Sequence, residues 1–389
     1  MNTEIIDTEL LIIGGGCAGL SLTSALIKRG YKKRIVILES RTHYADDRSW
    51  CVWSDIDSRA VENVSKNWSS WAFNIVNLPV QKRSGEALSY KYIRSLDFYQ
   101  SRLAEIKRAA AVSLHLNEAV EQISFEHSKW VVKTSSSLIS STYLIDTRPP
   151  VSDILKKSVL FQCFLGYEIE LEKPLTADLL ETAELMTNMR LVEGEFCFNY
   201  VLPISSTRLL VEVTFFARNP VPVEVIQTEL SALLLQRGWA AATIIRSEAS
   251  TLPMGLPEPK TKYPMTRISA GIGGGALRPS SSYGFLRINR WADACAKELC
   301  LGNPPQSHQD KRSLSDHVLR FMDLLFLNVI HRYPHLTPTV FARLFGSVKT
   351  PSFIRFMVDR PLIIDVVRVV MALPKIPFLN VLMRPRIKK

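Results

Sequence analysis

The chain has few cysteines and none in the arrangement of a zinc module or a disulfide framework. They are scattered over 389 residues without a C-x-x-C pair, which excludes the usual spacing of a structural zinc site. The N-terminal region lacks a basic flank followed by an apolar secretory core, so we expect a reduced, cytoplasmic protein. The six cysteines are Cys17, Cys51, Cys163, Cys197, Cys295 and Cys300.

Long apolar runs are also missing. No stretch reaches the ~20 apolar residues needed to span a bilayer, because the best candidate, residues 361–383, is interrupted by Asp365, Arg368 and Lys375. With 47% hydrophobic and 22% charged residues, the composition is that of a folded protein and excludes a disordered chain. The length allows two or three cores.

Acidic residues are scarce near the C-terminus. Residues 341–389 hold ten Lys or Arg against Asp359 and Asp365, and so contribute +8 of the net charge of +11. Apolar runs between these cations suit an anionic lipid surface, and we expect peripheral contact with the inner face of the membrane. A buried helix with a solvated basic end is the alternative. Nucleic-acid binding is not expected, because the cations alternate with aliphatic rather than aromatic residues. The cations are Arg343, Lys349, Arg355, Arg360, Arg368, Lys375, Arg384, Arg386, Lys388 and Lys389.

The first forty residues predict a β-α-β unit. Residues 8–13 form an apolar run typical of a buried parallel strand, and residues 20–29 form an amphipathic stretch ended by Gly30. A second predicted strand, residues 34–38, is followed by Glu39. A glycine-rich turn joins the first strand to the helix.

This turn carries the G-x-G-x-x-G fingerprint of dinucleotide-binding proteins. Gly14 permits the tight turn, Gly16 lets the backbone approach a pyrophosphate, and Gly19 lets helix and strand pack closely. The phosphates would meet the free N–H groups at the helix N-terminus. Glu39, twenty positions beyond Gly19, is placed to bind ribose hydroxyls, and its charge disfavours a 2′-phosphate. The unit therefore predicts FAD or NAD, the alternative being a turn that binds nothing.

A second glycine-rich segment, residues 269–284, favours FAD. It precedes a predicted helix over residues 284–300, the arrangement in which flavoproteins of the hydroxylase type place a helix N-terminus against the flavin. Residues 143–149 fit the strand and turn that close an FAD-binding sheet. The residues of the second segment expected at the cofactor are Gly274, Gly275, Pro279, Ser281 and Tyr283.

The predicted fold is α/β (α+β), with an interrupted first domain. Residues 1–150 and a return segment, residues 266–305, would form a Rossmann-like FAD-binding domain of the hydroxylase type. Residues 151–265 would form an inserted substrate domain with a mixed or antiparallel sheet and one long helix over residues 223–239. Residues 306–389 would form a helical, basic C-terminal region.

The chain resembles the FAD-dependent lycopene cyclases of carotenoid biosynthesis, of the bacterial and plant type. The most particular motifs are D-R-S-W-C-V-W at 47–53, P-I-S-S-T-R-L-L-V-E at 203–212 and V-V-M-A-L-P-K-I-P-F-L at 369–379. The resemblance implies ring closure at the ends of a linear C40 polyene, lycopene or a similar one, to β-ionone rings. It implies reduced FAD without net redox change, with NAD(P)H as a possible electron source only. It also places Arg48 and Trp50 near the isoalloxazine.

Such a reaction needs an acid able to protonate an alkene in a dry, electron-rich cavity. Glu212 is the candidate, because its strand is apolar on both faces. Burial would raise its pKa and keep it protonated near neutral pH. The family's acidic strand motif implies the same residue. Two alternatives are that Glu212 holds the reduced flavin and the cation in register, and that it is a structural carboxylate paired with Arg208.

Three positions depart from the family pattern. Val213 stands where a second acidic residue usually follows, Thr187 stands where relatives tend to have Asp, and Ser282 replaces a more frequent Gly. Losing two carboxylates would weaken the field that stabilises a carbocation. Ring type and true substrate therefore stay open.

Other functions and sites were weighed on the same residues. A flavin monooxygenase, a polyprenyl reductase, a cyclase of another polyene and a non-catalytic carotenoid-binding protein are the alternatives. His331 and His335 are separated by Pro334 and lack a nearby carboxylate, so no metal site is expected. Trp68 and Trp71, spaced as on one helical face, are expected to pack in the core.

Overall fold

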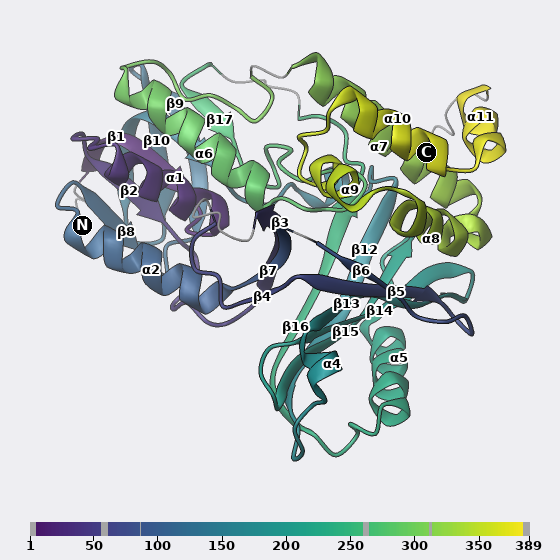
Figure 1. The fold of residues 1–389 in the computed structure, drawn as a ribbon. Coiled ribbons are helices and arrows are strands. Elements are labelled where there is room, and N and C mark those ends of the chain that lie inside the picture. The colour runs from purple at the N-terminus through teal and green to yellow at the C-terminus, as the bar shows by residue number, and fades with distance from the viewer. Residues whose placement is uncertain (1–4, 56–60, 86, 260–263, 311–312, 384–389) are drawn as a thin grey trace. The chain divides into compact units, whose positions relative to one another are not determined.

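A computed structural model describes residues 5–55, 61–85, 87–259, 264–310 and 313–383 (Figure 1). The chain forms two compact units, each assembled from three segments. Four of the basic residues noted above, Arg384, Arg386, Lys388 and Lys389, lie outside the described part. Unit 1 comprises Met1–Ala45, Leu96–Lys156 and Leu256–Ser313, and unit 2 comprises Asp46–Ser95, Lys157–Gly255 and Leu314–Lys389.

Unit 1 is built on a mixed sheet with strand order β8-β2-β1-β11-β10-β9, in which β17 also pairs with β11. The predicted β-α-β unit is confirmed, since β1 and β2 are parallel neighbours joined through α1. Its strands are β1 (Ile5–Ile13), β2 (Ile35–Leu38), β8 (Val112–His115), β9 (Val120–Glu126), β10 (Lys129–Thr134), β11 (Leu138–Asp146) and β17 (Arg267–Ser269). Its helices are α1 (Cys17–Lys28), α2 (Ser95–Arg108), α3 (Ser152–Leu155) and α6 (Phe285–Cys300).

Unit 2 is built on a second large sheet with strand order β16-β12-β15-β14-β13-β5-β6, and a small sheet with order β3-β7-β4. The large sheet is antiparallel except where β13 pairs with β5. Its strands are β5 (Ser70–Ile75), β6 (Gln81–Ser84), β12 (Leu160–Glu170), β13 (Thr182–Val192), β14 (Glu195–Pro203), β15 (Arg208–Ala217) and β16 (Thr243–Met254). The small sheet comprises β3 (Ser49–Asp55), β4 (Lys66–Trp68) and β7 (Leu88–Arg94).

The two faces of this large sheet bury different partners. Helix α5 (Val223–Gln236) covers one face through Leu230 and Leu233 (Figure 1). The opposite face packs against the small sheet and the C-terminal helices, with Trp53, Leu210 and Phe353 in one cluster. The remaining helices are α4 (Ala177–Leu180), α7 (Leu314–Arg332), η1 (Pro334–Leu336), α8 (Thr337–Ser347), α9 (Thr350–Met357), α10 (Ile363–Ala372) and α11 (Lys375–Met383).

The segment Asp46–Ser95 differs from the sequence-based division, which grouped it with the FAD-binding part. It belongs to unit 2 because β5 extends the large sheet through β13, and because the small sheet packs on that sheet's core. The C-terminal helices likewise share the core of unit 2. Core packing of Trp68 and Trp71 is confirmed, but both lie in strands, so the helical spacing was a wrong interpretation.

The described helices include none that is by itself long and apolar enough to cross a membrane. Helices α10 and α11 meet the length and composition criterion only when taken together, and the chain bends by 100° between them.

Candidate functional site

In unit 1 the first glycine turn has the geometry that its fingerprint predicts. Gly14 has φ +99°, and a Cβ atom at Gly19 would lie 2.1 Å from the carbonyl oxygen of Gly14. Side chains are therefore excluded at both positions. A Cβ at Gly16 would meet no atom within 4 Å, and no side chain caps the N-terminus of α1 there. The approach to the N-terminus of α1 is therefore open to an anion.

The second glycine segment packs against the first in the same unit. A Cβ at Gly271 would lie 3.2 Å from the Cβ of Ala18, and one at Gly273 would lie 2.6 Å from the Arg148 carbonyl oxygen. The Thr147 hydroxyl lies 2.8 Å from the carbonyl oxygen of Ile13. Three segments distant in sequence therefore converge. Of the remaining predicted residues, Gly274 and Gly275 lie in this segment, and Pro279, Ser281 and Tyr283 lie in the turn before α6.

Glu39 lies at the end of β2 and braces the glycine turn. Its Oε2 atom accepts hydrogen bonds from the Gly15 N–H at 2.7 Å and from Arg41 Nη2 at 3.0 Å. Burial alone would raise its pKa, but the bonds from Arg41 and Gly15 outweigh burial and lower it. The carboxylate is therefore ionised at neutral pH, with part of its hydrogen-bonding capacity already used by the protein.

Arg41 is a residue of this site that the sequence reasoning missed. Its guanidinium carbon lies 4.6 Å from the ring centroid of Tyr44 and 5.2 Å from that of Tyr99. Arg41 Nη2 also donates to the Gly15 carbonyl at 3.1 Å. The position of Arg41 two residues after Glu39 is only a weak sequence signal for this role. The contact with Tyr99 could not be read from the sequence, because Tyr99 lies on another element. The open Gly16 position, the uncapped helix and this braced turn fit the pyrophosphate and sugar of a dinucleotide.

Arg48 and Trp50 belong to unit 2. Arg48 Nη2 forms an ion pair with Asp47 at 2.7 Å, and Trp50 pairs with Ile93 between β3 and β7. Their role at the flavin stays a prediction.

Glu212 lies near the middle of β15, on the face of the large sheet opposite α5. Its strand neighbours Val211 and Val213 pack in the α5 cluster, whereas Glu212 is opposite Gly166 in β12 and Tyr200 in β14. Burial and, to a smaller extent, the charge of Glu248 together raise the pKa of Glu212 to about 8, although the Thr214 hydroxyl, which donates to Glu212 Oε1 at 2.5 Å, opposes both. The predicted burial and raised pKa are thus confirmed.

Arg208 does not pair with Glu212, contrary to the structural alternative. Arg208 Nε donates to Glu170 Oε2 at 2.5 Å, and Arg208 Nη1 lies 3.9 Å from Glu168 Oε1. Arg208 is paired in register with Glu170 at the beginning of β15, four residues before Glu212.

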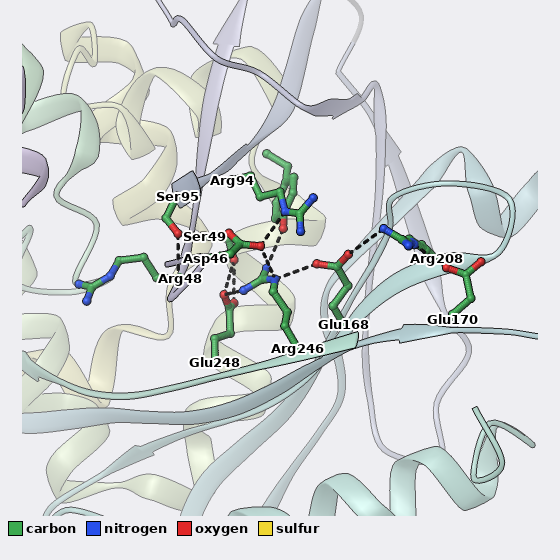
Figure 2. A network of polar contacts seen from close by, with 11 residues as sticks. Asp46, Arg48, Ser49, Arg94, Ser95, Glu168, Glu170, Arg208, Arg246 and Glu248 are labelled. Atoms are coloured by element: carbon green, nitrogen blue, oxygen red, sulfur yellow. Dashed lines mark hydrogen bonds and ion pairs between the residues drawn. The ribbon is translucent and has the colours of Figure 1, made fainter. Parts of the chain in front are cut away.

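A second buried carboxyl group, Glu248 of β16, is close enough to Glu212 for its charge to act on it. Figure 2 shows Glu248 as part of a polar network. Arg246 Nη1 forms an ion pair with Glu248 Oε2 at 2.7 Å, and the Ser49 hydroxyl lies 2.7 and 2.8 Å from the two carboxylate oxygens. Sequence reasoning missed Glu248, which stands in a strand with no motif around it.

Arg246 connects Glu248 to the rest of the network (Figure 2). Its Nε atom lies 2.7 Å from Glu168 Oε2 and 3.2 Å from Asp46 Oδ2, and its Nη2 donates to the Tyr92 hydroxyl at 2.8 Å. Asp46 also accepts from Arg94 Nε at 2.7 Å. The buried guanidinium therefore has its charge balanced by carboxylates on three sides.

Aromatic and neutral polar groups complete the surroundings of Glu212. The hydroxyl groups of Tyr90 and Tyr200 lie 2.9 Å apart. Burial raises the pKa of the Cys51 thiol to about 12, so this thiol is neutral and unsuited to be a base or nucleophile. Trp53 packs on Tyr90 with ring centroids 4.6 Å apart. Glu212 is thus a buried carboxyl group that lies opposite Tyr200 and whose charge is felt at Cys51.

A small hollow in unit 2 lies elsewhere, lined by Leu175, Leu179, Leu209 and Trp239 among others, without Glu212. Because Leu209 faces the α5 side, we do not assign this hollow to the carboxyl site.

Solved structures define the class of the fold. A flavoprotein/dehydrogenase from Cytophaga hutchinsonii matches with a TM-score of 0.61 at 13% identity, covering 96% of this chain and 99% of that one. A geranylgeranyl bacteriochlorophyll reductase-like protein from Thermoplasma acidophilum gives 0.60 at 9%, covering 95% and 96%. A probable FAD-dependent monooxygenase from Pseudomonas aeruginosa gives 0.55 at 14%, covering 86% and 96%. The chain has the mixed α/β fold of these flavoproteins, as predicted.

Sequence comparison then gives the family. The family model described as lycopene cyclase protein matches residues 9–383. A lycopene beta-cyclase from Pantoea ananas is 24% identical over 71% of this chain and 70% of its own length. One from Pseudescherichia vulneris is 22% identical over 95% of each chain. The chain belongs to the lycopene cyclase family.

Proposed function

We propose that this protein closes β-ionone rings at the ends of a linear carotenoid such as lycopene, by an acid-initiated reaction without net redox change. The observation that carries the proposal is Glu212, a buried carboxyl group whose pKa is raised to about 8. At neutral pH such a group is mostly protonated, and its cross-strand neighbour Tyr200 packs against the buried aromatic cluster of the same unit. That is the state a general acid for an alkene needs.

In the proposed reaction Glu212 transfers its proton to the terminal trisubstituted double bond and becomes a carboxylate. The resulting tertiary cation is attacked by the next double bond, which forms the ring C–C bond. Loss of a proton from the ring then gives the β-ionone end group. One proton enters and one leaves, so substrate and product are isomers. Trp53 and Tyr90 belong to the buried aromatic groups that would favour positive charge.

The glycine turns of unit 1 would hold FAD, with Gly14, Gly16 and Gly19 around the pyrophosphate and Glu39 with Arg41 stabilising the turn. Bound reduced FAD would supply an electron-rich ring system, with NAD(P)H needed only to keep it reduced. This assignment is supported by the open approach at Gly16.

A reductase or monooxygenase is the second candidate, because solved proteins with this fold include a reductase-like protein and a probable monooxygenase. Either reaction would consume NAD(P)H in proportion to product, whereas cyclisation would not. Stoichiometric consumption by the purified protein during turnover would favour this candidate.

The direct test is expression in cells that accumulate lycopene, followed by pigment analysis. We expect β-carotene or monocyclic γ-carotene, and lycopene alone with the Glu212→Gln variant at equal protein level. Unchanged lycopene with the parent chain, or a product of different oxidation level, would reject the proposal.

We further propose that the protein works in the cytoplasm, in peripheral contact with the inner face of the membrane. Helices α10 and α11 expose aliphatic side chains, among them Ile363 at 86%, Met371 at 68% and Ile376 at 73%. The acid of α10, Asp365, is fully buried instead. From Val366 to the end of the sequence there are six cations and no acid. An apolar face beside positive charge is suited to anionic lipid, from which an oily substrate would enter.

A further inference from the structure

Glu212 and Glu248 flank the same glycine. Gly166 of β12 is opposite Glu212 of β15 on one side and opposite Glu248 of β16 on the other. In an antiparallel sheet, residues in register across three strands project to one face. The two carboxyl groups therefore share a face of the large sheet, with no side chain between them.

Glycine at this position lets the carboxyl groups approach. A Cβ atom at Gly166 would lie 3.3 Å from the Cβ and 3.5 Å from the Cγ of Glu212. The Glu212 side chain thus occupies space directly beside Gly166. Even the single Cβ of an alanine at this position would require Glu212 to shift by a few tenths of an ångström.

We propose that Glu248 is a positioning residue of the acid site: held by its ion pair with Arg246 on the same face of the sheet, it keeps its neighbour Glu212 in the protonated form. The proposal rests on the function proposed above, in which Glu212 is the proton donor. Glu248 also remains charged after the proton has left, and its field would favour the cation.

Glu248 is bonded to a cation, whereas Glu212 is bonded to a neutral group, and the proposed role of Glu248 requires this difference. Arg246 donates to Glu248 at 2.7 Å, and its other contacts are with Glu168, Asp46 and Tyr92. Glu212 instead receives its bond from the neutral Thr214 hydroxyl. Two nearby carboxyl groups whose surroundings differ in this way separate into one anion and one acid.

Glu248 also supplies a negative charge that the family pattern would place at position 213, where this chain has Val213. Val213 is fully buried in the cluster under α5, on the opposite face from Glu212. A carboxylate at position 213 of this chain would therefore not face Glu212. The neighbouring negative charge comes instead from Glu248, on a strand two places away in the sheet.

The titratable groups facing the pair come from several elements. Burial, together with the charges of both glutamates, raises the pKa of the Cys51 thiol of β3, so this thiol is neutral. Tyr90 of β7 and Tyr200 of β14 are bonded to each other. The pKa of Tyr92 is raised by burial above its ordinary range. The Cys51 thiol and the Tyr92 hydroxyl are therefore neutral near pH 8. The charged groups on this side are Glu248 and Arg246, with Glu168 and Asp46 bound to the same arginine.

The test is an infrared titration of the protonated carboxyl C=O band in the full-length protein, with the Glu212 band assigned by its loss in Glu212→Gln. In Glu248→Gln we expect the titration of Glu212 to move to lower pH by on the order of one unit or more. Glu248→Asp keeps the charge and should restore most of the parent value. Glu168→Gln is the matched control, because it removes the same charge from the same arginine, and the shift should be much smaller.

Pigment formation measured against pH supplies the second readout. In Glu248→Gln the alkaline limit of cyclisation should move to lower pH together with the infrared titration. An unshifted Glu212 band, or an equal shift in Glu168→Gln, would overturn the proposal. A shifted band in a protein that forms no cyclic product would reject the proposed function and leave the coupling of the two glutamates established.

Discussion

Ser282 carries a side chain in a backbone conformation that favours glycine. Its φ is +53° and it is buried in the turn before α6. The resemblance to the family implies that Gly is more frequent here, and the backbone gives a reason, since a Cβ in the left-handed region costs about 1–2 kcal/mol.

We therefore expect Ser282→Gly to be more stable than Ser282→Ala by about 1 kcal/mol in denaturant unfolding. The alanine variant is the control because it also loses the hydroxyl but keeps Cβ. Equal stability of the two variants would contradict the role of the backbone.

Glu212 gives a pH-dependent prediction for activity. The reactive form is the acid, and its pKa is raised to about 8 by burial and then by Glu248. Cyclisation should therefore be retained at neutral pH and fall as pH rises through about 8. Glu212→Gln should lower the rate by about 10²-fold or more, measured as β-ring formation per bound flavin. Full activity in that variant would exclude Glu212 as the acid.

The same group makes a prediction for stability. Between its ordinary value of 4.5 and about 8, folded Glu212 keeps a proton that the unfolded chain has released. The free energy of unfolding should therefore decrease as pH rises across this interval. Glu212→Gln removes this dependence, so the variant should gain stability over the parent between pH 5 and 8. Unfolding curves at several pH values test this, and a constant difference would contradict it.

At the scale of elements, a buried carboxylate, Asp365, holds helix α10 in place. Asp365 is fully buried, accepts from Arg355 Nε and Nη2 at 2.7 Å each, and accepts from the Leu362 N–H at 2.9 Å. Although burial opposes ionisation, the bonds from Arg355, Ser352 and Leu362 hold the pKa of Asp365 at about 2. Aliphatic side chains such as Ile363 consequently face outward.

Asp365→Asn should destabilise the protein by about 2 kcal/mol, because a charge-assisted bidentate bond is lost. The stabilisation by Asp365 is complete above its ordinary pKa of 3.8 and is lost as pH falls toward 2. Chemical unfolding measures both effects. Asp153→Asn, at an exposed ion pair with Lys156, is the control and should change stability by less than about 0.5 kcal/mol.

At the scale of the whole molecule, the exposed α10–α11 face predicts binding to anionic vesicles. The parent chain should sediment with phosphatidylglycerol vesicles more than with phosphatidylcholine vesicles, and salt should weaken this binding. The Ile363→Asp, Ile376→Asp double variant should bind at least about tenfold more weakly, since each buried isoleucine contributes about 1.5–3 kcal/mol.

Leu235→Asp is the matched control, because Leu235 is 71% exposed on α5. It should bind vesicles like the parent. The membrane proposal would be rejected if the control lost as much binding as the double variant, or if the double variant bound as well as the parent. It would also be rejected if the parent formed a concentration-dependent dimer through this face in place of binding vesicles.

Much of unit 1 was predictable because its signals are local. The apolar run of β1, the turn at Gly14 and the acid at Glu39 follow one another within forty residues. The place of residues 46–95 was not predictable in this way. Two of their strands, β5 and β6, join a sheet whose other members lie more than seventy residues later, and no local pattern encodes that pairing.

In β15, too, one feature of the site could be predicted from the local sequence and another could not. Alternation along 208–216 was sufficient to predict that Glu212 is buried, because a strand's two faces follow from its own sequence. The partners of Arg208 and of Glu212 depend on the register of β12 and β16, which long-range pairing sets.

The sequence alone thus determined the dinucleotide turn, the flavoprotein class and the buried acid, since each depends on neighbours along the chain. Only the tertiary structure decided that Glu248 faces Glu212 across Gly166, that Val213 does not, and that the aliphatic side of α10 faces outward. These features arise from contacts between residues that the chain brings together only on folding.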